Sequence, residues 1–125
     1  MKEYGRPLPG DFFKKQIAGS MDLFRKRLSP LMYDTVAGLH RQGAAMCVAS
    51  GSPLPRVSLC LEVAKMQPFF SEQSVFTREL VSRGKPAPDL FLYVAEKMKT
   101  PVVACIVVED SSSGIEAALA ANMVT

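Results

Sequence analysis

The alternation of apolar runs with helix-like segments is the feature that most limits what this chain can fold into. Residues 44–49 and 102–108 are unbroken apolar runs, typical of strands that are covered on both faces in a parallel sheet. A short extended segment is expected at 74–76, and helices are expected at 11–28, 33–42, 57–66, 88–99 and 115–121. Gly43 is expected to cap the second of these helices at its C-terminus. The inward face of the helix at 88–99 is expected to hold Leu90, Phe91, Val94, Ala95 and Met98. This order predicts an α/β fold, with right-handed crossovers that place helices on the faces of a parallel sheet.

Composition excludes several other classes of protein. The 125 residues are 48% hydrophobic and 22% charged, as expected of one soluble folded domain. The longest apolar run has seven residues, whereas a membrane-spanning helix needs about 20. The first residues lack the apolar stretch of a secretory signal, so we expect a cytoplasmic protein. Cys47, Cys60 and Cys105 are widely spaced among apolar neighbours and are interpreted as buried thiols.

The net charge is +3, and its positive excess lies in residues 1–41, which hold eight Lys and Arg against four Asp and Glu, whereas residues 42–125 hold seven against eight. Lys14-Lys15 and 25–27 are the densest basic clusters, and both interrupt an apolar stripe. No aromatic pattern for stacking on bases accompanies them. The clusters therefore indicate a solvated helix face, and no nucleic-acid partner is expected.

Two polar elements could hold an anion. Ser50 and Gly51 directly follow the apolar run 44–49, where a hydroxyl and free backbone N–H groups can bind phosphate. Lys85 lies in the loop 83–89, whose prolines stiffen the backbone and fix the direction of the ammonium group. An ordinary capped turn and ordinary prolines before a helix explain the same residues, so both readings stay open.

Two carboxylates, Glu109 and Asp110, follow the run 102–108. Hard oxygen ligands at a strand end can hold Mg2+ beside a substrate phosphate. The alternative is a helix N-terminus capped by Asp110 or Ser111. Because parallel strands bring their carboxyl ends to one edge, we expect Ser50, Lys85, Glu109 and Asp110 to converge there.

Taken in this order, residues 49–52, 83–89 and 107–118 closely resemble three motifs of the haloacid dehalogenase (HAD) superfamily. The resemblance is to the subfamily of beta-phosphoglucomutase and the small sugar-phosphate phosphatases, and it runs from about residue 31 to the C-terminus. It implies a partial HAD-type Rossmann-like core over 31–125 and the end of a helical cap and linker over 1–30. The implied activity is Mg2+-dependent hydrolysis of a small phosphorylated metabolite, such as a sugar phosphate or sugar-acid phosphate.

The resemblance also implies roles for single residues. Ser50 would donate a hydrogen bond to the transferring phosphoryl group, and Gly51 would offer its backbone amide beside it. Lys85 would balance the charge of the nucleophile and the phosphate. Glu109 and Asp110 would hold the Mg2+ cofactor, directly or through water.

The family's nucleophile is the first acid of an Asp-x-Asp-Gly-Thr motif that ends the first strand, and this sequence contains no such motif. Asp34-Thr35 is the nearest match, but it is expected to open a helix. We therefore expect a fragment or truncated product that lacks the first and last strands of the core and is inactive by itself. The absent first strand would lie between 44–49 and 105–108 and leave a gap or a collapsed arrangement there.

Several alternatives remain open at this point. The chain could belong to a phosphomutase, or it could be a non-catalytic phosphate-binding module. A complementing chain could supply the missing strand and its aspartates. A dehalogenase that uses no metal is disfavoured, since two adjacent carboxylates repel without a cation nearby.

Overall fold

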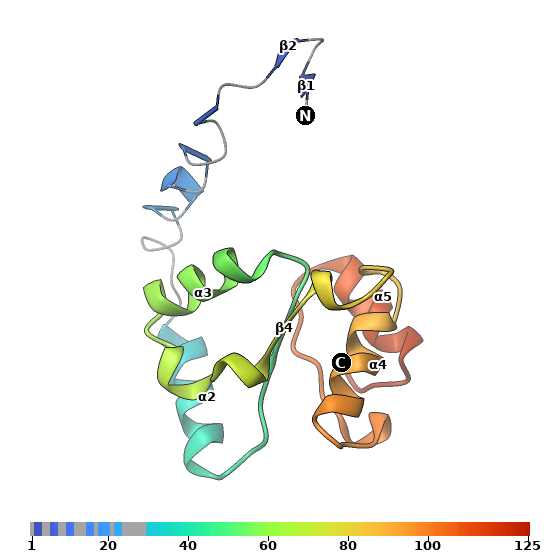
Figure 1. Cartoon of the computed structure of the whole chain (residues 1–125). Helices are drawn as coiled ribbons and strands as arrows, with labels where there is room; N and C mark the ends of the chain where they lie inside the picture. The colour runs from blue at the N-terminus through green and yellow to red at the C-terminus, as the bar shows by residue number, and fades with distance from the viewer. Residues whose placement is uncertain are drawn as a thin grey trace.

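The computed structural model describes residues 30–125 and, before them, 2–3, 6–7, 10–11, 15–16, 18–20 and 22–23 (Figure 1). Its helices and strands are β1 (Lys2–Glu3), β2 (Arg6–Pro7), α2 (Pro30–Arg41), β3 (Val48–Ser50), α3 (Leu54–Val63), β4 (Val75–Thr77), α4 (Asp89–Lys97) and α5 (Ser112–Ala120). Four short 3-10 helices are η1 (Gln67–Phe69), η2 (Glu72–Ser74), η3 (Arg78–Leu80) and η4 (Val102–Ala104). No helix among the described residues is long and apolar enough to cross a membrane.

The strands form separate pairs. β3 and β4 are parallel, with Val48 opposite Val75 and Ser50 opposite Thr77. A second parallel pairing is an isolated bridge between Ile106 and Val124. β1 and β2, which were not expected, form a small antiparallel pair. The α/β fold class is confirmed, while the gap or collapse expected between 44–49 and 105–108, where the family's first strand would lie, stays a prediction.

The two predicted strands are shorter than their apolar runs. The strand expected at 44–49 is observed only as β3, and most of the run 102–108 is not a strand, since it contains η4 and one bridge residue. Cys105 and Val107 pack against the core, whereas Ile106 and Val108 are 76% and 82% exposed. A strand needs a neighbour to pair with along its whole length, and in the described structure Val124 is the only strand partner of this segment.

The predicted helices are observed with shifted starts. α2 and α3 each begin three residues earlier than expected, at Pro30 and at Leu54, and each has a proline in its first turn, Pro30 and Pro55, where proline is well tolerated. The helix predicted at 11–28 falls mainly outside the described residues, although those described within 15–23 are helical. The three cysteines are free thiols, as interpreted, but they are half-buried and not buried.

All four described α-helices end in the same way. The residue after the C-cap adopts a left-handed conformation, and the last amides fold back onto carbonyls of the final turn. In α4, for example, Lys99 has φ +52° and the Thr100 amide donates to the Ala95 carbonyl at 3.0 Å. The left-handed residues are Gly43, Lys65, Lys99 and Asn122. Of these, sequence analysis predicted Gly43 alone as a cap.

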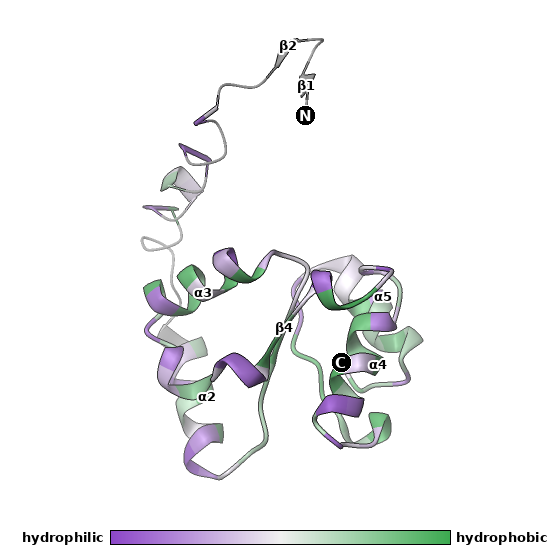
Figure 2. Ribbon diagram, viewed as in Figure 1, coloured by the Kyte–Doolittle hydropathy of each residue, from purple (hydrophilic) through white to green (hydrophobic). Residues whose placement is uncertain are grey.

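α4 carries the core of the molecule on two sides. Leu90 and Val94 pack with Phe76 of β4, and Phe91 and Ala95 pack with the alanines of α5. The spacing predicts that these four residues and Met98 face inward; the four are buried and Met98 is half-buried. Figure 2 shows hydrophobic residues along α5 and β4, with hydrophilic residues at turns and helix ends. α4 therefore connects the β3–β4 pair to α5, and its N-terminal loop carries Lys85.

Candidate active site

A pocket of about 550 Å3 lies where β3 and β4 end. The residues that line it are Val48, Ala49, Ser50, Gly51, Arg78, Gly84, Lys85, Glu109, Ser111 and Ser113. They come from four separate stretches of the chain. The structure thus brings Ser50, Gly51, Lys85 and Glu109 together at one edge, although up to 59 positions separate them in the sequence.

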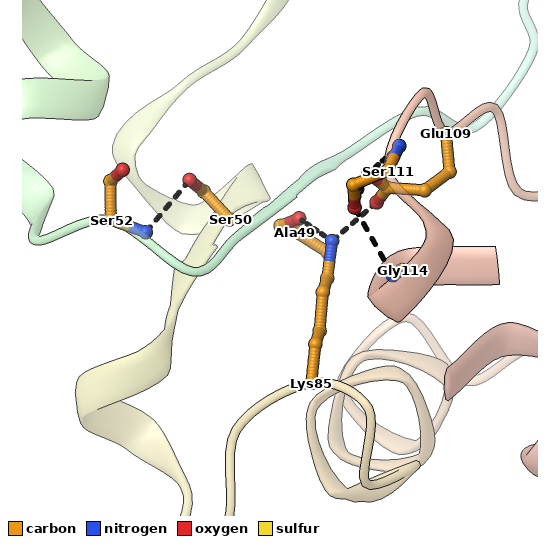
Figure 3. A network of polar contacts seen from close by, with 7 residues as sticks. All are labelled: Ala49, Ser50, Ser52, Lys85, Glu109, Ser111 and Gly114. Carbon is orange, nitrogen blue, oxygen red and sulfur yellow. Dashed lines mark hydrogen bonds and ion pairs between the residues drawn. The ribbon is translucent and has the colours of Figure 1, made fainter. Parts of the chain in front are cut away.

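Lys85 lies at the centre of the polar contacts (Figure 3). Its ammonium group donates to the Ala49 carbonyl at 3.2 Å and pairs with a carboxylate oxygen of Glu109 at 2.5 Å. The same group lies 4.9 Å from the centroid of the Phe91 ring, within range of a cation–π contact. The side chains of Lys85 and Glu109 are only 12% and 13% exposed. Solvent therefore screens this ion pair far less than a surface pair.

Glu109 is fixed from two sides. One carboxylate oxygen accepts from Lys85, and the other accepts from the Ser111 hydroxyl at 2.8 Å and from the Ser111 amide at 3.3 Å. Burial would raise the pKa of Glu109, but the hydrogen bonds from Lys85 and Ser111 and the charge of Lys85 outweigh it and hold this pKa below its ordinary value. Glu109 is therefore ionised at neutral pH.

Gly114 allows Glu109 to take this position. A Cβ atom at residue 114 would collide with the carboxyl carbon, the Cγ atom and one carboxylate oxygen of Glu109. The Gly114 amide also donates to the Ser111 hydroxyl at 3.1 Å, which makes Ser111 the N-cap of α5. The capping role that sequence analysis left open between Asp110 and Ser111 thus belongs to Ser111.

Ser50 and Gly51 form the opposite wall of the pocket. The Ser50 hydroxyl accepts from the Ser52 amide at 3.1 Å, which leaves its own hydrogen able to donate. A Cβ atom on Gly51 would meet nothing within 4 Å, so the backbone of Gly51 is open to an approaching group. Glu79 secures the turn that follows, since its carboxylate accepts from the Leu54 amide and the Thr77 hydroxyl, both at 3.3 Å.

Asp110 does not join this arrangement. It is exposed and is not among the residues that line the pocket. Within the described part of the chain, no three His, Cys, Asp or Glu side chains lie close enough together to hold a metal ion. Glu109 and Asp110 have the hard oxygen atoms that Mg2+ prefers, but two carboxylates, one of them paired with Lys85, are too few for a protein-made Mg2+ site. The residues present therefore do not form a complete site for the ion.

Four lining residues have no site role in the sequence analysis. Gly84, Ser111 and Ser113 lie within the motifs 83–89 and 107–118, whereas Arg78, directly after β4, lies outside every motif. The place of Arg78 near Gly51 depends on the register of β3 and β4, which the sequence does not specify. Asp34 lies inside α2 and not in the pocket lining, which includes no aspartate.

The charges of the pocket favour an anion. Its charged lining residues are Arg78, Lys85 and Glu109, which together leave one positive charge. The Ser50 hydroxyl and the open backbone of Gly51 add hydrogen-bond donors. Such a site can bind a phosphate group, although none of its lining residues is a carboxylate free to act as a nucleophile.

Comparison with known proteins adds to this geometry. The family model for haloacid dehalogenase-like hydrolases matches residues 8–122. Fructose-1-phosphate phosphatase YqaB of Escherichia coli K12 is 34% identical over 110 residues, which cover 88% of this chain and 56% of that protein. Phosphoglycolate phosphatase of the same organism is 34% identical over 95 residues, which cover 76% of this chain and 37% of that protein.

A solved structure shows the same fold. A HAD family hydrolase from Deinococcus radiodurans R1, with bound phosphate and sodium, has a TM-score of 0.75 and 27% identity to this chain. The match covers 96% of this chain and 53% of that protein. The chain thus spans about half, or less, of the length of these relatives. The family resemblance inferred from the three motifs is confirmed.

Proposed function

Because the chain belongs to the haloacid dehalogenase-like hydrolase family, we propose that it forms the phosphate-binding part of a phosphohydrolase for a small phosphorylated metabolite. The substrate class is a sugar phosphate or sugar-acid phosphate. Two relatives support this class, since their names specify fructose-1-phosphate and phosphoglycolate as substrates. The net positive pocket at the ends of β3 and β4 supports the phosphate part of this substrate.

The position of Lys85 is the observation that carries the proposal. Its ammonium group is held between the end of β3 and Glu109, at the centre of a pocket with open backbone and hydroxyl donors. Here Lys85 balances the charge of a bound phosphoryl group, while Ser50 and the amide of Gly51 donate hydrogen bonds to its oxygens. Fixed donors of this kind stabilise charge without having to reorganise when the charge develops.

Mg2+ dependence is part of the proposal for the whole enzyme. The family resemblance assigns Glu109 and Asp110 to the ion, but Glu109 is paired with Lys85 and Asp110 lies outside the pocket lining, so the bound phosphate and other carboxylates would have to complete the site. Mg2+ contributes Lewis-acid stabilisation of phosphoryl oxygens when it is bound. We expect this chain alone to bind Mg2+ weakly, because only two carboxylates are available.

The absence of an Asp-x-Asp-Gly-Thr motif sets what this chain can do by itself. Lys85 and Ser50 can bind and orient a phosphoryl group. By the family resemblance, covalent phosphoryl transfer also needs the aspartate nucleophile. The proposal therefore includes inactivity of the isolated chain, with phosphate binding retained. For activity, a complementing segment or chain would have to supply the missing strand and its aspartates. A phosphomutase of the same family is the alternative function, and it would use the same phosphate-binding residues.

The proposal also places the protein in the cytoplasm. Its three cysteines are free thiols, which suits a reducing compartment better than an oxidising one. Neither a membrane nor a nucleic acid is a proposed partner.

An assay with p-nitrophenyl phosphate and Mg2+ tests this function on refolded, monodisperse protein. We expect no turnover from the unsubstituted chain or from Lys85→Ala. Inorganic phosphate should bind to the unsubstituted chain and should bind more weakly to Lys85→Ala. Turnover that disappears in Lys85→Ala would show that another residue serves as nucleophile. It would overturn the assignment of the chain as an inactive part of the enzyme.

A further inference from the structure

Arg78 is a pocket residue that none of the motifs includes. It is the first residue of η3 and directly follows β4, whose last residue, Thr77, lies opposite Ser50. The parallel register therefore carries Arg78 to the same edge as Gly51, and both residues line the pocket. Its side chain then turns toward the segment that precedes Lys85.

Three contacts connect Arg78 to this segment. One guanidinium nitrogen donates to the Val81 carbonyl at 2.7 Å, and the other terminal nitrogen donates to the Ser82 carbonyl at 3.2 Å. The aliphatic stem lies over Gly84, where a Cβ atom would be 2.5 Å from Cδ and 2.7 Å from Nε of Arg78. Arg78 thus contacts three of the four residues immediately before Lys85.

This segment needs support from side chains because it has little of its own. Residues 82–84 belong to no helix or strand. Lysine has a flexible four-carbon stem, so its ammonium group points in one direction only if the backbone beneath it is fixed. Arg83, before Lys85, and Asp89, after it, close the loop around Lys85 with two hydrogen bonds of 3.1 and 2.8 Å. Arg78 connects the start of this loop to the end of β4.

The chemistry of this support is specific to arginine. A planar guanidinium can donate to two neighbouring carbonyls at once, with donors in fixed directions. A lysine at this position would keep the positive charge but would lose the two fixed donors that reach both carbonyls. Gly84 completes the arrangement, since any side chain there would push the stem of Arg78 away.

We propose that Arg78 is a positioning residue for Lys85: it holds the 81–84 segment against the end of β4 so that the ammonium group meets Ala49 and Glu109. The inference rests on the proposed function, because Lys85 is the residue proposed to meet the phosphoryl group. Gly84 serves the same purpose by leaving room for the arginine stem.

Two measurements on the full 125-residue chain test this role. The first is the rate at which an amine-reactive reagent labels Lys85 relative to exposed Lys97, resolved by peptide mass spectrometry. The second is the affinity for inorganic phosphate. We compare Arg78→Lys and Gly84→Ala with Arg41→Lys, a matched substitution in α2, which contributes nothing to the pocket lining.

We expect both site variants to label Lys85 about tenfold faster and to bind phosphate about tenfold more weakly, the equivalent of one lost hydrogen bond. Arg41→Lys should change neither value. A lower melting temperature with unchanged Lys85 labelling would show that Arg78 only stabilises the fold, and would overturn the inference. If the unsubstituted chain binds no phosphate, the proposed function fails, whereas faster labelling in the site variants would still support the positioning role.

Discussion

Gly114 shows how one missing side chain shapes the candidate site. The Glu109 carboxylate occupies the space that a Cβ atom of residue 114 would fill, and from there it contacts Lys85 and Ser111. Among the described glycines only Gly43 has a positive φ, so the backbone at Gly114 would accept alanine without strain. The glycine is needed for the close approach of Glu109 and not for its own conformation.

Gly114→Ala should therefore destabilise the protein only while Glu109 is present. Alanine in a helix is favoured over glycine by about 1 kcal/mol, but here its methyl group would displace the Glu109 carboxylate and break the contacts with Lys85 and Ser111. We expect the free energy of unfolding in urea to fall by about 1–2 kcal/mol.

The control is the same substitution in a Glu109→Ala background. With the carboxylate removed, Gly114→Ala should be neutral or stabilising, so the two changes should be strongly non-additive. Equal losses in both backgrounds would contradict the role assigned to Gly114.

The helix ends show what sequence can and cannot predict at the level of elements. Gly43 was predicted as a cap because glycine adopts a positive φ without strain. Lys65, Lys99 and Asn122 adopt the same conformation, with φ of +57°, +52° and +59°, but the two lysines give no sequence signal for it. After Lys65 and Asn122 the next residue, Met66 or Met123, is buried, so the chain turns back into the core, which is a tertiary constraint.

Lys99→Gly should stabilise the protein. Its side chain is exposed and its left-handed backbone costs about 1 kcal/mol in a residue with a Cβ atom. We expect the free energy of unfolding to rise by about 0.5–1 kcal/mol in thermal or urea denaturation.

Glu96→Gly, an exposed position within α4, provides the matched control. There glycine should cost about 1 kcal/mol, because the residue is helical. If both glycines destabilise the protein alike, Lys99 does not act as a left-handed cap.

The organisation of the whole molecule was only partly predictable. Alternating segments predicted the α/β class, and the three motifs predicted the family. The common edge of parallel strand ends predicted that Ser50, Lys85, Glu109 and Asp110 meet, and all but Asp110 line the pocket. Apolar character predicts burial but does not specify a partner. For this reason, the run 102–108 was expected to be a full strand although Ile106 and Val108 are exposed.

Polar contacts were still harder to predict. Asp110 and Glu109 are adjacent in the sequence, yet only Glu109 lines the pocket. Sequence could not distinguish the two acids, because the choice depends on where Lys85 and Gly114 lie. Arg78 was missed for a similar reason, since its contacts depend on the register of β3 and β4.

The most direct test of the account is a titration of the 15N-labelled chain with inorganic phosphate at constant ionic strength. The amide chemical shifts are recorded at each phosphate concentration. We predict shifts that are concentrated at Ser50, Gly51, Lys85 and the start of α5, and that are lost in Lys85→Gln but kept in Lys97→Gln. Lys97 is an exposed cation of α4 that does not line the pocket. Shifts that are absent, or that persist in Lys85→Gln, would contradict the claim that this pocket is the phosphate site of a HAD-like hydrolase.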